Sequence, residues 1–296
     1  MQHDAYHLIL PAQRTSRVVF ACPHSGRDYS AAFLQATALD STVLRSSEDA
    51  FVDLLFQSAP LEGAALLVAR APRAFVDLNR NEDEFDPALI LGVPRLPHNP
   101  RIASGLGVIP RVVANGRAIY CGKLPLAEAQ ERIAKFWRPY HLALATLLSE
   151  QRKRFGQAIL IDCHSMPHEA IVAFGASVIA RNRTAPRPDV VLGDRYGAAS
   201  AGWVMDRVEA AFVDAGFRVA RNAPFAGAFV AQQYGRPSIG QHVIQVEIDR
   251  ALYMDESRIV PNAQFDEMRL RLAQVTARIA ALGVEPERDD LRLAAE

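Results

Sequence analysis

Two histidines of this chain each follow a run of apolar residues. His24 comes after residues 17–22, RVVFAC, and His164 comes after residues 158–161, AILI. Apolar runs of this length are typical of strands that are buried on both faces of a parallel sheet. Open α/β sheets bind their ligands beyond the carboxyl ends of the strands. We therefore expect both histidines at one edge of a sheet, where an imidazole is placed for chemistry or for binding a metal ion.

Carboxylates that suit the same chemistry occur at two further places. Glu48 and Asp49 are adjacent, and Glu247 lies in residues 242–248, HVIQVEI, whose alternation predicts a strand. A catalytic zinc ion is often bound by two histidines and one carboxylate, and a separate carboxylate then accepts a proton from water. The residues suit a hydrolytic zinc site with Asp49 or Glu48 as the oxygen ligand and Glu247 as the base.

The same residues also have structural interpretations. A helix beginning at Ser46 or Ser47 would place Glu48 and Asp49 in its first turn, where acidic side chains stabilise the helix dipole. A histidine at a strand end is often a hydrogen-bonded structural residue, and the chain has no H-E-x-x-H motif. The residues alone leave both interpretations open.

Strands and helices alternate in the predicted secondary structure. The predicted strands cover 17–22, 64–69, 158–161, 189–192, 217–220 and 242–248. The predicted helices cover 31–38, the residues after Ser46, 126–154 with a kink or break at Pro139, 198–215 and 265–282. This alternation favours a single α/β domain over residues 1–296, with a mostly parallel sheet flanked by helices.

Residues 86–125 carry a high share of the proline and glycine of the chain, and we predict an irregular segment. Long irregular segments in compact domains are usually functional or disordered. Apolar residues such as Ile109, Val113 and Ile119 indicate order. We expect this segment to form a lid or a wall of a pocket.

Composition excludes several classes of partner. The 296 residues include 33 Lys or Arg and 33 Asp or Glu with no basic block, so there is no electrostatic case for nucleic acid. Half of the residues are hydrophobic, which is enough for a sizeable core. No apolar run is long enough to span a membrane, no signal peptide is evident, and three cysteines are too few for a disulfide framework. We expect a cytoplasmic protein that acts on a small molecule.

Several motifs in a fixed order resemble the N-formylglutamate amidohydrolase family. They are PHSGR at 23–27, the acidic pair and the residues up to 53, ARAPRAFVDLNR at 69–80, GLGVIPR at 105–111, IDCHSMP at 161–167, VLGDRYG at 191–197, NAPFAG at 222–227 and QVEIDRALYMDE at 245–256. The family is similar in fold to the zinc carboxypeptidase and aspartoacylase group. The resemblance implies a mixed central sheet flanked by helices and zinc-dependent hydrolysis of an N-acyl amino acid. It also implies a place in histidine degradation.

The resemblance assigns roles to individual residues. His24 and His164 match the metal-binding histidines, and Glu247 matches the general base. The carboxypeptidase pattern H-x-x-E would require a carboxylate at position 27, where this chain has Arg27, so the third ligand must come from elsewhere. Asp49 matches the recurring Asp of the family better than Glu48 does.

Further residues are assigned to the substrate. Asn79 and Arg80 of DLNR resemble the pair that binds a substrate carboxylate in the carboxypeptidase relatives, and Arg73 matches the arginine that polarises the scissile carbonyl. A salt bridge from Arg80 to Asp77 or Glu82 is an equal alternative. Three more residues lie in family-like motifs and are expected to line the pocket: Arg111, Asn222 and Tyr253.

Three functions compete at this point. The leading hypothesis is a zinc amidohydrolase that cleaves the linear amide of N-formyl-L-glutamate into formate and L-glutamate, with Arg80 and one arginine of residues 95–117 binding its two carboxylates. The second keeps this machinery and changes the substrate to another N-acyl amino acid or a small peptide-like amide. The third is a non-catalytic protein that binds an acidic ligand, against which the presence of His24, His164 and Glu247 together argues.

Overall fold

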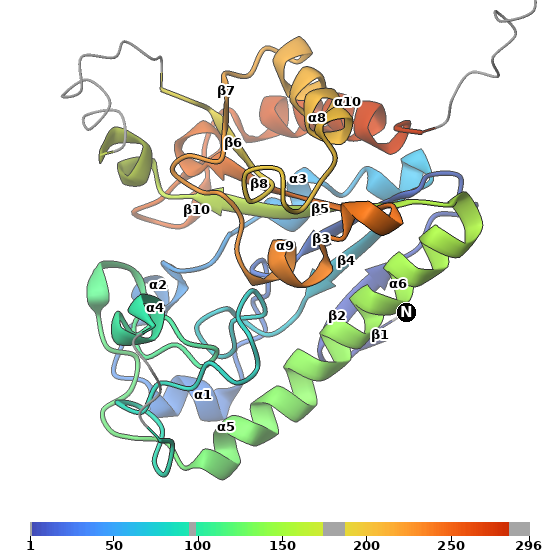
Figure 1. Cartoon of the computed structure of the whole chain (residues 1–296). Helices are drawn as coiled ribbons and strands as arrows, with labels where there is room; N and C mark the ends of the chain where they lie inside the picture. The colour runs from blue at the N-terminus through green and yellow to red at the C-terminus, as the bar shows by residue number, and fades with distance from the viewer. Residues whose placement is uncertain (1, 95–98, 174–186, 284–296) are drawn as a thin grey trace, which may run out of the picture.

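A computed structural model describes residues 2–94, 99–173 and 187–283. Within them, eight strands form one sheet in the order β1-β2-β4-β3-β5-β8-β6-β7 (Figure 1). These strands are β1 (Gln2–His3), β2 (Tyr6–Ile9), β3 (Val18–Cys22), β4 (Ala65–Ala69), β5 (Ala158–Met166), β6 (Val190–Gly193), β7 (Val219–Arg221) and β8 (Gln241–Asp249). Two short strands, β9 (Met254–Asp255) and β10 (Val260–Pro261), pair apart from it.

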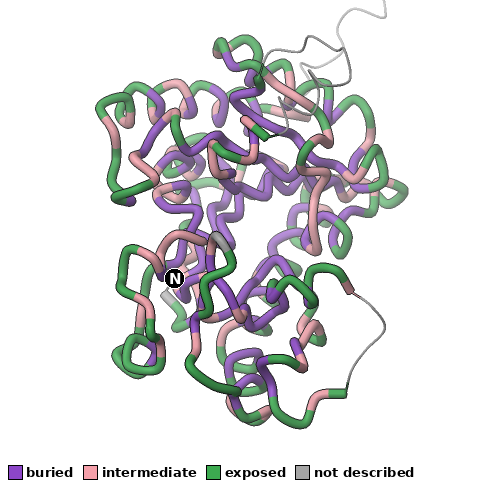
Figure 2. The backbone as a smooth tube through the Cα atoms, turned by 90° about the vertical axis from the view of Figure 1, so that its left-hand side faces the viewer, coloured by how far each residue is buried: buried purple, intermediate pink, exposed green. Residues whose placement is uncertain are grey.

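The centre of the sheet is parallel. β4, β3, β5 and β8 run in one direction, whereas β2 and β6 pair antiparallel to β4 and β8. Every residue of β3, β4 and β5 is buried, as expected for strands covered on both faces (Figure 2). The predicted α/β class with a mixed, mostly parallel sheet is confirmed.

Helices cover both faces of the sheet. The helices whose bounds the structure describes are α1 (Ala31–Ala36), α2 (Ser41–Arg45), α3 (Val52–Leu55), α4 (Pro100–Ala103), α5 (Leu126–Arg132), α6 (Arg138–Phe155), α8 (Gly202–Asp214), α9 (Phe229–Tyr234) and α10 (Phe265–Ala280). α3, α8 and α10 pack on one face of the sheet, and α5, α6 and α9 pack on the other. Side chains alternate across each strand. Phe20 of β3 packs in the core with α3, α8 and α10, whereas its neighbours Val19 and Ala21 pack in the core with α5, α6 and α9.

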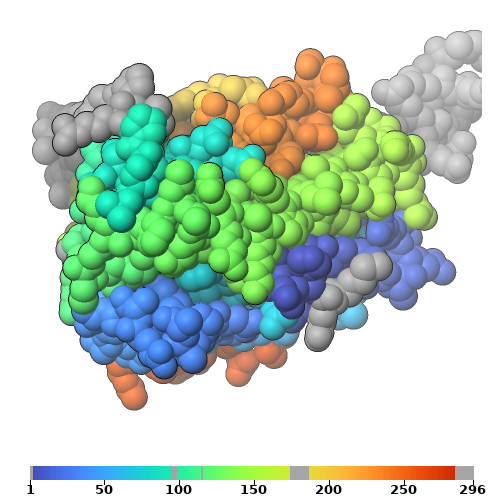
Figure 3. Space-filling view, turned by 90° about the horizontal axis from the view of Figure 1, so that it is seen from below, coloured from blue at the N-terminus to red at the C-terminus, as the bar shows by residue number. Residues whose placement is uncertain are grey.

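The long helix predicted over 126–154 is present with a local irregularity. α5 and α6 are joined by a π-helical turn, Ile133–Trp137, directly before Pro139, which lies in the first turn of α6. Proline has no N–H to donate, so the helix ladder is perturbed in the turn before it. Figure 3 shows α5 and α6 as one continuous band across this face of the molecule. No helix in the described ranges is long and apolar enough to cross a membrane.

The helix predicted after Ser46 is wrong in its position. α2 ends at Arg45 and α3 begins only at Val52, so Glu48 and Asp49 lie in the turn between the two helices. Phe51, the residue directly before α3, adopts a left-handed φ of 66°, and its side chain accepts no hydrogen bond from the first turn of that helix. The two carboxylates therefore do not stabilise the first turn of a helix, and their side chains can make other contacts.

The central strand is longer than predicted. β5 continues from Ala158 to Met166, so His164 lies within the strand and not in a loop after it. Its register with β8 places His164 beside Glu247. The polar residues continue the strand because β8 supplies hydrogen-bonding partners along its whole length.

The segment 86–125 is largely irregular but ordered where it is described. Val108 and Ile109 pack into the core on the α6 side of the sheet, and Val113 and Ile119 pack with Phe33 of α1. The prediction of order from its apolar residues is confirmed for the described part. Residues 95–98 lie outside the described ranges.

Candidate metal centre and substrate pocket

A cavity of about 660 Å³ lies at the carboxyl ends of the parallel strands. His24 follows β3, His164 lies near the end of β5 and Glu247 near the end of β8, and all three line the cavity. Residues 101–116 of the irregular segment contribute a wall, which confirms the expectation of a pocket wall.

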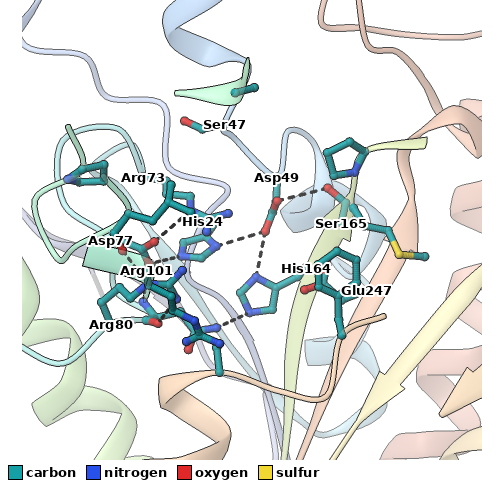
Figure 4. Close-up of a pocket in the computed structure, with 18 of the residues that line it drawn as sticks. His24, Ser47, Asp49, Arg73, Asp77, Arg80, Arg101, His164, Ser165 and Glu247 are labelled. Atoms are coloured by element: carbon teal, nitrogen blue, oxygen red, sulfur yellow. Dashed lines mark hydrogen bonds and ion pairs between the residues drawn. The ribbon is translucent and has the colours of Figure 1, made fainter. Parts of the chain in front are cut away.

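Three buried side chains converge in this cavity. Potential ligand atoms of His24, Asp49 and His164 all lie within 4.8 Å of one another. Asp49 Oδ2 lies 2.9 Å from His164 Nδ1 and 3.3 Å from His24 Nδ1 (Figure 4). His24 Nδ1 is buried and, apart from this approach to Asp49, has no hydrogen-bonding partner among the described residues. Two imidazoles and one carboxylate are the donor set of many catalytic zinc sites, so these residues fit a divalent metal ion.

The outer ring nitrogens of both histidines are held by carboxylates. His24 Nε2 lies 2.7 Å from Asp77 Oδ1, and His164 Nε2 lies 3.0 Å from Asp162 Oδ2 and 3.2 Å from Asn79 Nδ2. Metal-binding histidines almost always donate the other ring N–H to such a partner, which sets the tautomer and the ring orientation. Both Nδ1 atoms are therefore directed at the shared position beside Asp49.

Electrostatics favour a cation between these groups. Burial opposes the charge of Asp49, but contacts from His164 and His24 outweigh it and hold the pKa of Asp49 well below its usual range. Burial also opposes protonation of His164, but Asp162 and Asp49 outweigh it and raise the pKa of His164 well above its usual range. Protons therefore compete with any ion that binds here.

The structure distinguishes Asp49 from its neighbour Glu48. The Glu48 carboxylate accepts a hydrogen bond of 2.5 Å from the Tyr29 hydroxyl and pairs with Arg45 at 3.1 Å. It does not line the cavity. Of the two acidic residues, Asp49 is the one that joins the histidine pair.

Glu247 lies beside the metal-site residues in a desolvated position. Gln245 Nε2 donates a 2.8 Å hydrogen bond to Glu247 Oε1, and the Gln245 side-chain oxygen accepts from the Ala228 N–H at 3.0 Å. Burial raises the pKa of Glu247 to about 7, although His164 and Arg73 oppose the rise. A carboxylate whose pKa is near neutrality is suited to accept and return a proton.

Among the described residues, four arginines line the cavity, and they fall into two kinds. Arg73 pairs with Asp77 at 3.1 Å, and Arg250 pairs with Asp49 at 3.1 Å. Arg80 and Arg101 have no carboxylate partner within 4.0 Å in the part of the chain that the structure describes.

The salt bridge considered for Arg80 is therefore absent. Asp77 pairs with Arg73 and His24, and Glu82 pairs with Arg138. Arg80 instead donates through Nε to the carbonyl of Leu106 at 3.0 Å and through Nη1 to that of Asn79 at 2.7 Å. Its Nη2 group has no partner in these contacts and remains for a ligand.

Asn79 lines the cavity, but its amide is used inside the protein. The side-chain oxygen accepts from the Val230 N–H at 2.8 Å, and the nitrogen approaches His164 and Gln245. These contacts hold the residues after Gly227 in place, and the amide nitrogen also donates to Asp162 Oδ2 at 3.5 Å, the carboxylate that accepts from His164. They differ from the substrate contact that the resemblance implies.

The expectation that Arg111, Asn222 and Tyr253 line the pocket is not met. Arg111 pairs with Asp86 at 2.8 Å, and the Tyr253 hydroxyl donates to the Ala50 carbonyl at 3.0 Å with no exposed surface. The side-chain oxygen of Asn222 accepts from the N–H groups of residues 194 and 196. All three make contacts within segments that adjoin the cavity.

Sequence reasoning missed several residues of the site: Asp77, Asp162, Gln245 and Arg250. It expected one arginine of residues 95–117 without choosing among them, and Arg101 is the described arginine of that range that lines the cavity. Asp162 precedes His164 by two positions, so the period of a strand places both on one face, and this signal was available. Arg250 reaches Asp49 across 201 positions of sequence, and no local pattern indicates such a contact.

Fold and site together define a class of protein. A buried His-Asp-His group at the carboxyl edge of an α/β sheet, with an acid of raised pKa beside it, is the arrangement of a hydrolase with a metal site. Residues 16–254 match the model of the N-formylglutamate amidohydrolase family, and the chain belongs to that family.

Individual relatives agree with this assignment. N-formylglutamate deformylase from Pseudomonas aeruginosa is 28% identical over 243 residues, which are 81% of this chain and 82% of the relative. The deformylase of Pseudomonas putida is 27% identical over the same length. The crystal structure of N-formylglutamate amidohydrolase from Ralstonia eutropha JMP134 superposes with a TM-score of 0.84 and 35% identity, covering 94% of this chain and 97% of the other. The Agrobacterium tumefaciens protein Atu2144, with 17% identity and a TM-score of 0.61, shares the fold.

Proposed function

We propose that this protein hydrolyses the amide bond of N-formyl-L-glutamate and releases formate and L-glutamate. The observation that carries the proposal is the convergence of His24, Asp49 and His164 beside Glu247, in a cavity that also holds two arginines with no carboxylate partner in the described ranges. The names of the two Pseudomonas relatives support the same substrate.

The metal ion of this proposal is zinc, held by His24 Nδ1, His164 Nδ1 and Asp49 Oδ2. When bound, zinc acts as a Lewis acid and lowers the pKa of water to about 7. Asp77 and Asp162 orient the two imidazoles by accepting their outer N–H groups, which leaves Nδ1 of each ring for the ion.

Glu247 transfers the proton in this proposal. It accepts a proton from the water that forms the new C–O bond at the formyl carbon, and it returns that proton to the nitrogen as the C–N bond breaks. Gln245 holds the carboxylate in position through its 2.8 Å hydrogen bond. A positioned acid–base group of this kind contributes about 10²- to 10⁴-fold to the rate.

Arg73 stabilises the charge that develops on the formyl oxygen. Its Nε is fixed by Asp77, so the terminal nitrogens of the guanidinium are left to face the cavity. Burial lowers the pKa of Arg73, but Asp77, Asp49 and Glu247 outweigh this effect and raise it, so the side chain stays charged. Removal of such a donor typically costs about 2.7–4 kcal/mol of transition-state stabilisation.

Arg80 and Arg101 bind the two carboxylates of the substrate. A guanidinium meets a carboxylate through paired hydrogen bonds, and neither arginine has a carboxylate within 4.0 Å among the described residues. We assign the α-carboxylate to Arg80 and the side-chain carboxylate to Arg101. In Figure 4, Arg73, Arg80 and Arg101 lie on the His24 side of the site, and Glu247 lies beyond His164. Asn79 then orients Asp162, the carboxylate that holds His164, and does not bind substrate.

A second candidate keeps the reaction and enlarges the substrate. The cavity of about 660 Å³ lies within the range of about 300–1,000 Å³ of sites for drug-sized ligands. This favours a larger N-acyl amino acid or a small peptide-like amide. A non-catalytic binding protein would have no use for Glu247, a buried carboxylate of raised pKa beside the metal-site residues.

Formate release from N-formyl-L-glutamate tests the proposal. We expect turnover by the purified protein that is lost with a chelator and restored by added zinc. A panel of formyl, acetyl and succinyl amino acids separates the two candidates, because the first predicts a clear preference for formyl-glutamate. A folded protein that binds zinc but cleaves no member of the panel would contradict both.

A further inference from the structure

The two oxygens of Asp49 have different surroundings. Oδ2 faces the Nδ1 atoms of His24 and His164, at 3.3 and 2.9 Å. Oδ1 points away from them and accepts from Arg250 Nη2 at 3.1 Å and from the Ser165 hydroxyl at 3.4 Å. One oxygen is thus available for an ion, and the other is already bound by the protein.

Arg250 is itself held on all sides. It directly follows β8 and is 7% exposed. Besides Asp49, its Nε donates to the Ser165 hydroxyl at 3.1 Å and its Nη1 donates to the Ser46 carbonyl at 3.1 Å. Every nitrogen of the guanidinium therefore has a partner within the protein. Although Arg250 borders the cavity, it differs from Arg80 and Arg101 in that its charge is paired with the carboxylate of Asp49, whereas those two have no carboxylate within 4.0 Å among the described residues.

We propose that Arg250, with Ser165, is a positioning residue that makes Asp49 a one-oxygen ligand of the metal ion. This inference rests on the metal site of the proposed function. A carboxylate free to rotate can place both oxygens on an ion and occupy a position that a catalytic site needs for water and substrate. The bonds to Oδ1 oppose that rotation and leave Oδ2 alone to face the histidines.

Two physical effects of Arg250 on the ion have opposite signs. Its positive charge repels a cation, so removal of the charge would strengthen metal binding if repulsion dominated. Its hydrogen bonds orient the ligand, so their removal would weaken metal binding if orientation dominated. We expect orientation to dominate, because the charge of Arg250 is already balanced by Asp49. The direction of the change in zinc affinity therefore distinguishes a positioning role from a merely electrostatic one.

The experiment compares zinc affinity in the intact protein and in four variants by competition with a chromophoric chelator. Arg250→Met should weaken zinc binding by about 10- to 100-fold, the usual effect of losing a group that orients a metal ligand. Arg250→Lys, which keeps the charge and one donor nitrogen, should recover part of the lost zinc affinity. Ser165→Ala should weaken zinc binding less than Arg250→Met does. Arg132→Met is the control, since Arg132 is 4% exposed and lies outside the cavity.

The visible spectrum of the cobalt-substituted protein supplies a second readout. Four-coordinate cobalt absorbs more strongly than cobalt with more ligands, so a second Asp49 oxygen on the ion should weaken the absorption in Arg250→Met. Zinc affinity that is unchanged or tighter in folded Arg250→Met, or an equal loss in Arg132→Met, would overturn the inference. If Arg250→Met does not fold, Arg250→Lys and Ser165→Ala decide it in the same way. Failure of the unaltered protein to bind zinc would instead overturn the metal site of the proposed function.

Discussion

The two sides of the cavity are built differently. On the metal side, His164 and Glu247 lie on paired strands. His24 and His164 are buried and contact the carboxylates of Asp77 and Asp162, and Asp49 lies beside both rings. On the other side, Arg101 is exposed on the four-residue helix α4 within the irregular segment. Rigid strands hold reacting groups accurately, whereas loops tolerate change. In the proposed function, the sheet therefore holds the reacting groups, and the irregular segment supplies one of the two arginines that select the substrate.

Glu247→Gln should have the largest effect on the reaction and should act on the metal side alone. The amide can still accept the hydrogen bond from Gln245 but cannot take a proton from water. We expect kcat to fall by about 10²- to 10⁴-fold with little change in KM or in zinc affinity. Steady-state kinetics and a zinc titration on the same preparation check this. Full turnover by the variant would remove Glu247 from the role of base.

Arg80→Met and Arg101→Met should affect the substrate side. Loss of a charged hydrogen-bonded pair costs about 1.5–3 kcal/mol, so KM for N-formyl-L-glutamate should rise by about 10- to 100-fold in each variant. With N-formyl-L-glutamine, which lacks the side-chain charge, Arg101→Met should behave almost like the unaltered protein, whereas Arg80→Met should remain impaired.

The control for this pair is Arg117→Met. Arg117 is exposed in the same segment and does not line the cavity, so its loss should leave KM unchanged. Equal effects of Arg101→Met on both substrates would show that Arg101 does not read the side-chain carboxylate. The irregular segment would then not be the part of the cavity that selects the substrate through Arg101.

The pH dependence of kcat/KM should report Glu247. Burial raises the pKa of this carboxyl to about 7. A general base acts only when deprotonated, so activity should fall as the pH drops through that pKa, by about tenfold per unit well below it. A bound cation stabilises the carboxylate and moves the fall to lower pH. Rates measured at saturating zinc keep metal loss out of the profile, and a rate independent of pH through this range would contradict the assignment.

Tyr253→Phe should have the smallest effect. The substitution removes the hydrogen bond from the Tyr253 hydroxyl to the Ala50 carbonyl and keeps the ring in the core. We expect a loss of about 0.5–1.5 kcal/mol in the free energy of unfolding, measured by denaturant titration, with KM unchanged. A raised KM at unchanged stability would return Tyr253 to the substrate-binding residues.

The sequence by itself determined the strands that hold the reacting groups. Apolar runs predicted β3 and the first half of β5, and alternation predicted β8, because the period of a strand and the burial of its side chains are written in neighbouring residues. The same local signals placed His24 and His164 at one edge of the sheet. They missed the extension of β5 to Met166, because pairing with β8 stabilises polar residues that have no strand signal of their own.

Only the tertiary structure decided which polar residues meet. Asp49 joins the histidines and Glu48 does not, because Tyr29 and Arg45 bind Glu48 on the other side of the turn. Arg250 reaches Asp49 from the far end of the chain. The physical reason is that a hydrogen bond or an ion pair depends on distances of a few ångströms between side chains. Those distances follow from how the whole chain packs, whereas the period of a helix or strand is a property of a few neighbouring residues.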